Sequence, residues 1–208
     1  MVKIYPSLMA SRQEELTAML SRLKGVAKNL HLDVADGHFV ATKVNWFDFK
    51  LSRSVSYSAH LMVDQPLNWI ENYGHLMSTI IIHPEPLRDV MLVLGEIKAL
   101  KKKAGIALKP ETTVASVKRY LSMVDVVVVL TVHPGYYGAK FLSAPLKKIK
   151  QIKKINPRIE VIVDGGINPL TIRSAVKAGA DAVVSGSFIT KSADPKKARL
   201  ELMRAARS

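Results

Sequence analysis

Short apolar runs alternate along this chain with longer segments in which apolar and polar positions recur at helical spacing. The short runs predict eight β-strands, over Lys3–Leu8, Asn29–Val34, Val55–Val63, Thr79–His83, Gly105–Leu108, Val124–Thr131, Glu160–Val163 and Ala182–Ser185. The segments between them predict helices over Gln13–Leu23, Leu87–Lys102, Val114–Leu121, Pro145–Ile155, Pro169–Ala178 and Pro195–Ala206. The last three begin with proline, which suits the first turn of a helix.

Strand and helix units repeated in this number predict a parallel sheet, either closed as an eight-stranded barrel or open and doubly wound. The strand count and the length of 208 residues favour a small closed barrel. An open dinucleotide-binding sheet is disfavoured because no G-x-G-x-x-G follows the first strand. No linker rich in Pro, Gly or Ser divides the chain, so we expect one α/β domain over residues 1–208.

The composition, 48% apolar and 23% charged, suits a globular domain that buries a substantial core. Because the chain has no cysteine, it can form neither a disulfide framework nor a thiolate metal site, and any metal must be held by nitrogen and oxygen ligands. Polar or charged residues interrupt every apolar stretch before it reaches membrane-spanning length. We therefore expect a soluble, cytoplasmic protein with no membrane partner.

The chain is strongly basic, with 31 Lys and Arg against 17 Asp and Glu and a formal charge of +14. This charge would concentrate phosphorylated metabolites or nucleic acid near the surface, and charge alone does not choose between them. Many of the cations lie in the helical patterns KALKKK, LKKIKQIKK and DPKKARLELMRAAR, so we expect them on solvated outer helix faces. With no low-complexity arm and no interleaved aromatic stripe, a nucleic-acid partner is not expected.

Four residues that can ligate a metal, His31, Asp33, His60 and Asp164, fall at or near the ends of the runs NLHLDV, SYSAHLMV and EVIVDGG. Alternation along a strand places His31 and Asp33 on the same face. Because the active site of such a barrel lies at the C-terminal ends of its strands, the four side chains should converge. Two imidazoles and two carboxylates then predict a site for one divalent metal ion, either zinc, iron or manganese.

Each of these residues also has a structural interpretation when it is taken singly. His31 or His60 can be a hydrogen-bonded core histidine, and Asp33 can cap the loop that follows it. We expect Asp36 and His38 to shape that loop rather than to bind metal. His83 ends the fourth predicted strand and either lines the pocket or has a structural role.

Three glycine-rich segments follow the sixth, seventh and eighth predicted strands: PGYYG at 134–138, DGG at 164–166 and SGS at 185–187. Glycine lets backbone amides approach an anion closely, and loops after the last two strands of such barrels frequently bind phosphate. The segments therefore predict a phosphorylated small substrate. The alternative is that they are tight turns that need glycine conformations.

The motifs HLDVADGHFV, AHLMV, HPE, LTVHPGYYGAKF, VDGGI and SGS occur in order across nearly the whole chain. In this combination the chain resembles the ribulose-phosphate 3-epimerase family. The resemblance implies a single-domain (β/α)8 TIM barrel of the ribulose-phosphate-binding type, which interconverts D-ribulose 5-phosphate and D-xylulose 5-phosphate. It also implies a homo-oligomer, since family members commonly associate through barrel surfaces.

The resemblance further implies that His31, Asp33, His60 and Asp164 bind one divalent metal and that the two aspartates form an acid and base pair. One aspartate would remove the C3 proton to give a 2,3-enediolate, and the other would protonate the opposite face. Residues expected to contact the phosphorylated ketose are Ser7, His60, Met62, Gly138, Gly165, Gly166, Gly186 and Ser187. No organic cofactor is required.

Several positions depart from the family pattern. PSLMASRQ lacks the aspartate of P-S-I-L-S-A-D-F, and Ala35 stands where the family has methionine. His133, Tyr137 and Ala139 replace an acid, a glycine and a glutamine of T-V-E-P-G-F-G-G-Q, and the segment 41–50 differs from P-N-L-T-x-G. None of the four proposed metal ligands is lost.

Three alternatives remain open at this point. A related ketose phosphate, such as allulose 6-phosphate, can be epimerised with the same groups. A decarboxylase of the orotidine-phosphate type is disfavoured because its D-x-K-x-x-D is absent after Asp33. A barrel that has lost catalysis and binds nucleic acid or another polyanion would explain the charge and the altered loops.

Overall fold

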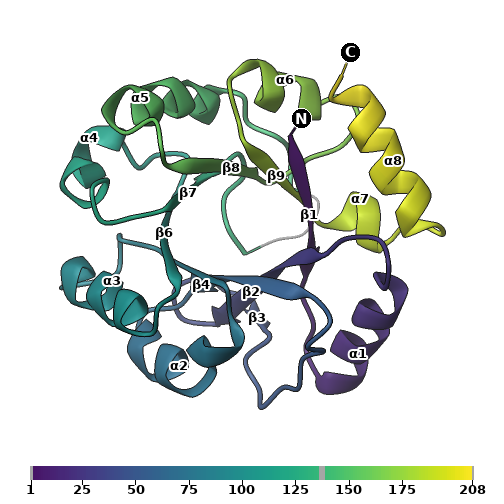
Figure 1. Ribbon diagram of the computed structural model, residues 1–208, viewed down its shortest axis with the longest axis horizontal. Coiled ribbons are helices and arrows are strands. Elements are labelled where there is room, and N and C mark those ends of the chain that lie inside the picture. Colours follow the sequence, from purple (N-terminus) through teal and green to yellow (C-terminus); the bar gives the residue numbers. More distant parts are fainter. Residues whose placement is uncertain (1, 136–138, 208) are drawn as a thin grey trace.

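A ring of eight parallel strands with helices around it forms the centre of the molecule (Figure 1), in a computed structural model that describes residues 2–135 and 139–207. The strand order is β1-β9-β8-β7-β6-β5-β4-β2, and β1 also pairs with β2, which closes the ring. A short ninth strand, β3, pairs antiparallel with the end of β2. The fold is the (β/α)8 TIM barrel, so the prediction of a closed rather than an open sheet is confirmed.

All eight predicted strands are present, with ends that differ by at most two residues from the prediction. β2 continues beyond Val34 to Asp36 because β3 adds a partner there, with Ala35 opposite Val44 and Asp36 opposite Lys43. The strands are β1 (Lys3–Leu8), β2 (Asn29–Asp36), β3 (Lys43–Val44), β4 (Ser56–Met62), β5 (Thr79–Ile82), β6 (Lys103–Leu108), β7 (Val126–Leu130), β8 (Glu160–Asp164) and β9 (Ala182–Ser185).

The helices lie outside the ring (Figure 1). They are α1 (Gln13–Arg22), α2 (Pro66–Tyr73), α3 (Val90–Ala99), α4 (Val114–Val117), α5 (Lys147–Ile155), α6 (Ile172–Lys177), α7 (Ser187–Thr190) and α8 (Pro195–Ala205). The helices α1 to α6 connect successive strands, whereas β2 and β4 are joined through β3, and α7 and α8 follow the last strand, β9. Short 3₁₀ turns cover Gly74–Leu76, Lys118–Tyr120 and Ala144–Leu146.

Two predicted helix starts are wrong, and local side-chain capping explains both. α3 begins at Val90 instead of Leu87 because the Asp89 side chain caps it, accepting a hydrogen bond from the Leu92 N–H at 3.0 Å. α6 begins at Ile172 because Asn168 folds residues 168–171 into a turn, where its side chain accepts from the Leu170 N–H at 2.9 Å.

Other helix ends also differ from the prediction. The segment predicted as Val114–Leu121 changes from α-helix to a 3₁₀ turn at Lys118, and the segment predicted from Pro145 is 3₁₀ until Lys147. α2, α7 and β3 were not predicted. None of the helices in the described part of the chain is long and apolar enough to span a bilayer.

The core has two layers because alternate residues of each strand point to opposite faces. Along β7, Val126, Val128 and Leu130 fill the inside of the barrel, where they pack with residues such as Ile81 and Ile162. The side chains between them, Val127 and Val129, join the larger cluster between strands and helices. Strands buried on both faces account for the nearly continuous apolar runs in the sequence.

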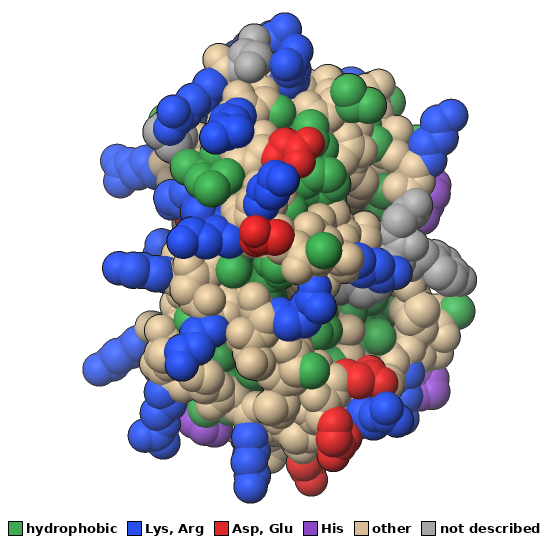
Figure 2. Space-filling model, turned by 90° about the vertical axis from the view of Figure 1, so that its right-hand side faces the viewer, with side chains coloured by type: hydrophobic (Ala, Val, Ile, Leu, Met, Phe, Trp, Pro, Cys, Tyr) green, Lys and Arg blue, Asp and Glu red, His purple; other side chains and the backbone are tan. Residues whose placement is uncertain are grey.

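Figure 2 shows the side of the barrel that α1, α7 and α8 cover, and Lys and Arg side chains stand out on it with few acids between them. On α8, Lys196, Lys197 and Arg204 are exposed, as the helical charge pattern predicts. The prediction is wrong for Lys148 of α5, which is only 4% exposed. Its Nζ donates to the backbone carbonyls of Lys109 at 2.6 Å and Pro110 at 3.0 Å.

Candidate active site

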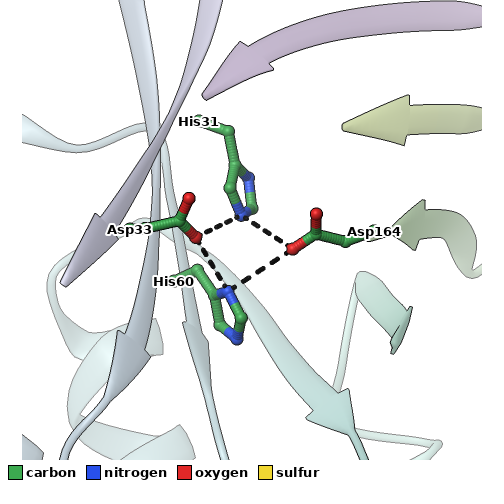
Figure 3. A group of neighbouring side chains, drawn as sticks. All are labelled: His31, Asp33, His60 and Asp164. Carbon is green, nitrogen blue, oxygen red and sulfur yellow. Dashed lines mark hydrogen bonds and ion pairs between the residues drawn. The ribbon is translucent and has the colours of Figure 1, made fainter. Parts of the chain in front are cut away.

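His31, Asp33, His60 and Asp164 converge at one end of the barrel from three different strands (Figure 3). β2 carries His31 and Asp33, two positions apart and therefore on the same face, while β4 carries His60 and β8 carries Asp164. The strand register places Asp33 directly opposite His60. Parallel strands thus bring together residues that lie up to 133 positions apart in the chain.

The four ligand atoms alternate between nitrogen and oxygen around a closed ring (Figure 3). Asp33 Oδ1 lies 3.5 Å from His31 Nε2 and 3.1 Å from His60 Nδ1. Asp164 Oδ2 lies 3.9 Å and 3.7 Å from the same two nitrogens. Ligands about 2.0–2.1 Å from a tetrahedral metal are roughly 3.4 Å apart, so these spacings suit one ion at the centre.

His31 provides the test of whether a metal fits this site. Its side chain is fully buried, and neither ring nitrogen has a hydrogen-bond partner among the described residues. An unpaired buried polar atom is costly, about 1–3 kcal/mol, and a metal bound to Nε2 would satisfy this one. Burial lowers the pKa of His31 to about 4, even though the Asp33 charge opposes this, so the ring is neutral near pH 7 as a metal ligand must be. The residues fit a divalent cation.

The pKa values of Asp164 and His60 reflect the negative charge of the carboxylates at this site. Burial and the nearby Asp33 charge raise the pKa of Asp164 to about 7. Burial alone would lower the pKa of His60, but the hydrogen bond and charge of Asp33, with the charges of Asp164 and Glu85, raise it above its ordinary value. Two carboxylates in one buried site favour a cation between them.

A second pair of residues lies behind His60. His60 Nε2 is 3.0 Å from His83 Nε2, and His83 Nδ1 is 3.1 Å from Glu85 Oε2. Burial lowers the pKa of His83 to about 4, whereas hydrogen bonds from His83 and Thr112 overcome burial and bring the pKa of Glu85 to about 2. His83 therefore lies behind His60 and is not among the residues that line the pocket.

A cavity of about 680 Å³ opens beside the quartet. Asp33, His60 and Asp164 line it, while His31 lies beneath. The residues expected to contact substrate that lie on its wall are Ser7, His60, Met62, Gly165, Gly166, Gly186 and Ser187. Gly138 and Tyr137 lie outside the described residues.

The glycines at 165 and 166 are required by backbone geometry. Gly165 has φ +113° and Gly166 has φ +65°, in the region that side chains other than glycine rarely adopt. A Cβ on Gly165 would lie 2.5 Å from Val132 Cγ2, and one on Gly166 would lie 3.0 Å from Phe141 Cβ. The loop after β8 therefore packs its backbone closely against Val132 and Phe141, and both glycines line the pocket.

The loop after β2 is shaped as predicted for Asp36. Its Oδ1 accepts from the backbone N–H groups of His38 at 2.8 Å and Phe39 at 3.1 Å, and its Oδ2 accepts from that of Asp64 at 3.0 Å. His38 takes part through its backbone. Ala35, where the family has methionine, is fully buried and packs with Val40 and Met62.

The structure places the other departures from the family pattern at different distances from the site. Ala139 lines the pocket, whereas His133 is exposed and its Nδ1 lies 3.7 Å from Glu111 Oε2. The segment 41–50 contains Asn45, which is fully buried with φ +47°. Its Nδ2 donates to the carbonyls of Leu8 at 2.9 Å and Asp33 at 2.7 Å, so it ties β1 to the strand that carries the ligands.

Sequence reasoning missed Asn45 and several pocket residues. The only local signal for Asn45 is that asparagine tolerates positive φ. Pocket residues that were not predicted to contact substrate include Lys140 and Phe141, which lie in the motif LTVHPGYYGAKF but were given no role, and Asn168 and Thr171, which follow β8 outside any of the motifs.

Comparison with known proteins adds independent findings. The family model described as the ribulose-phosphate 3 epimerase family matches residues 3–190. The ribulose-phosphate 3-epimerase of Bacillus subtilis is 31% identical, over 97% of this chain and 98% of that protein. The ribulose-phosphate 3-epimerase of Helicobacter pylori is 36% identical, over 94% of each.

Solved structures support the fold alone. A mutant tryptophan synthase α-subunit from Pyrococcus furiosus superposes with a TM-score of 0.68 at 17% identity, covering 99% of this chain and 96% of that one. The barrel fold and the converging quartet are consistent with the family that the family model and the relatives indicate. The chain belongs to the ribulose-phosphate 3-epimerase family.

Proposed function

We propose that this protein is a metal-dependent enzyme that epimerises D-ribulose 5-phosphate and D-xylulose 5-phosphate at C3, and that residues 1–208 act as one TIM-barrel domain. The observation that carries the proposal is the convergence of Asp33 and Asp164, from strands on different sides of the barrel, at the wall of one cavity. Inverting a carbon centre needs one group to remove a proton and another to return it on the opposite face.

The metal ligands in this proposal are His31, Asp33, His60 and Asp164, and zinc, iron and manganese all suit this ligand set. A divalent ion held there supplies positive charge that stabilises the oxyanion developing on the substrate. The unpaired nitrogens of His31 and the alternating ring of ligand atoms support the assignment.

The two aspartates carry the proton transfer. One carboxylate removes the C3 proton, which produces a 2,3-enediolate, and the other delivers a proton to the opposite face. Both carboxyl groups line the cavity, and their side chains are only 9% and 16% exposed. Such burial keeps bulk water from the transferred proton.

The phosphate of the substrate binds at the loops after β8 and β9 in this proposal. Gly166 follows β8 and the Gly186–Ser187 pair follows β9; all three line the pocket, and their backbone N–H groups donate to no other part of the described chain. Amide groups at the end of a barrel strand bind phosphate well. Ser7 and Met62 contact the sugar between the phosphate and the quartet.

The test is a coupled assay on D-ribulose 5-phosphate with purified protein, before and after removal of metal by a chelator and restoration of zinc, iron or manganese. Asp33→Asn and Asp164→Asn should each reduce kcat by at least about 10²-fold, because each removes a proton carrier. Asp64→Asn is the matched control, since Asp64 is an exposed carboxylate that follows β4.

Turnover that disappears with chelator, returns with metal and requires both aspartates supports the proposal. Near-normal turnover in either aspartate variant would refute the mechanism. Turnover of allulose 6-phosphate but not of ribulose 5-phosphate would keep the mechanism and change the substrate. No turnover of either sugar phosphate with any metal would refute the enzymatic proposal and favour a barrel that binds a polyanion.

A further inference from the structure

The face of His60 that points away from the metal position contacts a second buried histidine. His60 and His83 are each 1% exposed, and their Nε2 atoms lie 3.0 Å apart. A hydrogen bond between two imidazole nitrogens needs one N–H donor and one bare acceptor. The proton position on His83 therefore determines the proton position on His60.

Glu85 determines the proton position on His83. Its Oε2 lies 3.1 Å from His83 Nδ1, and an ionised carboxylate only accepts hydrogen bonds. Nδ1 of a neutral His83 must then carry the proton, which leaves Nε2 as an acceptor. His60 must donate through Nε2, and its Nδ1 keeps a lone pair that faces Asp33 Oδ1 at 3.1 Å and Asp164 Oδ2 at 3.7 Å.

The rest of the network holds Glu85 and His83 in place. Glu85 Oε1 accepts from the Thr112 hydroxyl and from the Lys109 N–H, so this carboxylate is bonded on both oxygens. Phe39 covers the His83 ring, with ring centroids 4.7 Å apart. Buried Lys148 fixes the carbonyl of Lys109, so the loop that donates to Glu85 is itself anchored.

We infer that His83 and Glu85 are positioning residues that select the Nε2–H tautomer of His60 and thereby present its Nδ1 lone pair to a metal ion. The inference rests on the proposed role of His60 as a metal ligand. Second-layer partners of ligating histidines change metal affinity by roughly 10–100-fold when they are replaced. The charged partner here acts through an intervening histidine.

Glu85→Gln is the sharpest perturbation because it reverses the direction of the chain of hydrogen bonds. The Gln carbonyl accepts from Thr112 and Lys109, so its NH₂ group faces His83 Nδ1 and donates to it. His83 must then donate through Nε2, which forces the proton of His60 onto Nδ1, where the metal would bind. His83→Phe removes the acceptor without reversing the direction, so its effect should be smaller.

The experiment measures zinc affinity by competition with a chromophoric chelator, together with the histidine tautomers by ¹⁵N NMR, for metal-free and zinc-loaded protein. We expect zinc affinity to fall about 10–100-fold in Glu85→Gln. Glu111→Gln is the matched control, since Glu111 is an exposed glutamate that also lies beside a histidine, with its Oε2 3.7 Å from His133 Nδ1, and the zinc affinity of this variant should change less than 2-fold, within the about 0.5 kcal/mol typical of surface changes. Circular dichroism identifies any variant that fails to fold. In that case the histidine tautomers of the wild-type protein test the inference.

The wild-type protein should carry the proton of His83 on Nδ1 and, with zinc bound, that of His60 on Nε2. A proton on Nε2 of His83, or unchanged zinc affinity in Glu85→Gln, would overturn the inference. Wild-type protein that binds no zinc would overturn it together with the metal part of the proposed function. Normal zinc binding with the expected tautomers but no epimerisation would refute only the proposed reaction and would leave the inference about His83 and Glu85 standing.

Discussion

Gly165→Ala should destabilise this protein more than any glycine substitution in an open turn, because it combines two separate penalties. Gly165 has φ +113°, a conformation that costs a residue with a side chain about 1–3 kcal/mol. The added methyl would also lie 2.5 Å and 2.9 Å from the two γ-carbons of Val132 and 3.0 Å from its backbone nitrogen. Val132 is buried and follows β7, so it has little room to move.

Forcing a methyl group into such a packed position costs about 1–3 kcal/mol. The sum of the two penalties is about 2–6 kcal/mol, a large share of the roughly 5–15 kcal/mol that stabilises a typical domain. At about 2–4 °C per kcal/mol for a chain of this size, a loss near 4 kcal/mol lowers Tm by roughly 8–16 °C. Urea unfolding followed by circular dichroism measures the free energy directly.

Two other glycines separate the penalties. Gly25 has φ +75° but no atom within 4 Å of an added Cβ, so Gly25→Ala should lose only the conformational part, about 1–2 kcal/mol. Gly95 lies within α3 with open space around it, so Gly95→Ala should stabilise the protein by about 0.5–1 kcal/mol. If Gly165→Ala is no more destabilising than Gly25→Ala, the argument from Val132 is wrong. A Val132→Ala change in the Gly165→Ala background should recover part of the loss.

Two further predictions concern buried charges away from the quartet. Burial alone would raise the pKa of Asp36, but the N–H groups of Asp64, His38 and Phe39 together hold it below its ordinary value. Asp36→Asn should therefore lower the free energy of unfolding by about 1–3 kcal/mol at pH 7. This stabilisation is complete above the unfolded-state pKa of about 3.9 and is lost as the pH falls through the lower folded-state pKa, so urea titrations at pH 7 and pH 3 should show the difference shrinking. Lys148→Met should cost about 1–3 kcal/mol by leaving two carbonyls unpaired, whereas Lys150→Met on the exposed face of the same helix should change stability by less than about 0.5 kcal/mol; equal effects of the two in a thermal melt would contradict this.

The strands could be predicted from the sequence because a barrel strand is buried on both faces, which leaves an apolar run such as VVVVL in β7 that needs no long-range information. The quartet could be predicted because its members end such runs. α2 was missed because its sequence, PLNWIENY, mixes apolar and polar residues over only two turns. β3 was missed because its two residues are a strand only through their pairing with β2.

The surroundings of the quartet could not be predicted for a different reason. Asn45 is important through hydrogen bonds to Leu8 and Asp33, and nothing in the adjacent sequence specifies those partners. Lys148 belongs to a run of lysines that are otherwise typical of a solvated helix face, and only the position of the Lys109 carbonyl distinguishes it. Hydrogen bonds between distant segments depend on the completed fold, so a local pattern does not contain them.

The pairs of neighbouring strands in the barrel differ in how many residues they align, and the shortest pairing, between β1 and β2, lies beside the candidate active site. β2 and β4 align over seven residue pairs, whereas β1 and β2 align only at Ser7 with His31 and at Leu8 with Leu32 in the described chain. Local opening of a protein begins where the fewest backbone bonds must break. Warming should therefore separate β1 from β2 first, which would displace His31 and Ser7 while the remainder of the barrel stays folded. A metal ion bound by the quartet would then be lost before global unfolding. Because the four ligands lie on β2, β4 and β8, such an ion would link strands on both sides of the β1–β2 pairing that closes the barrel.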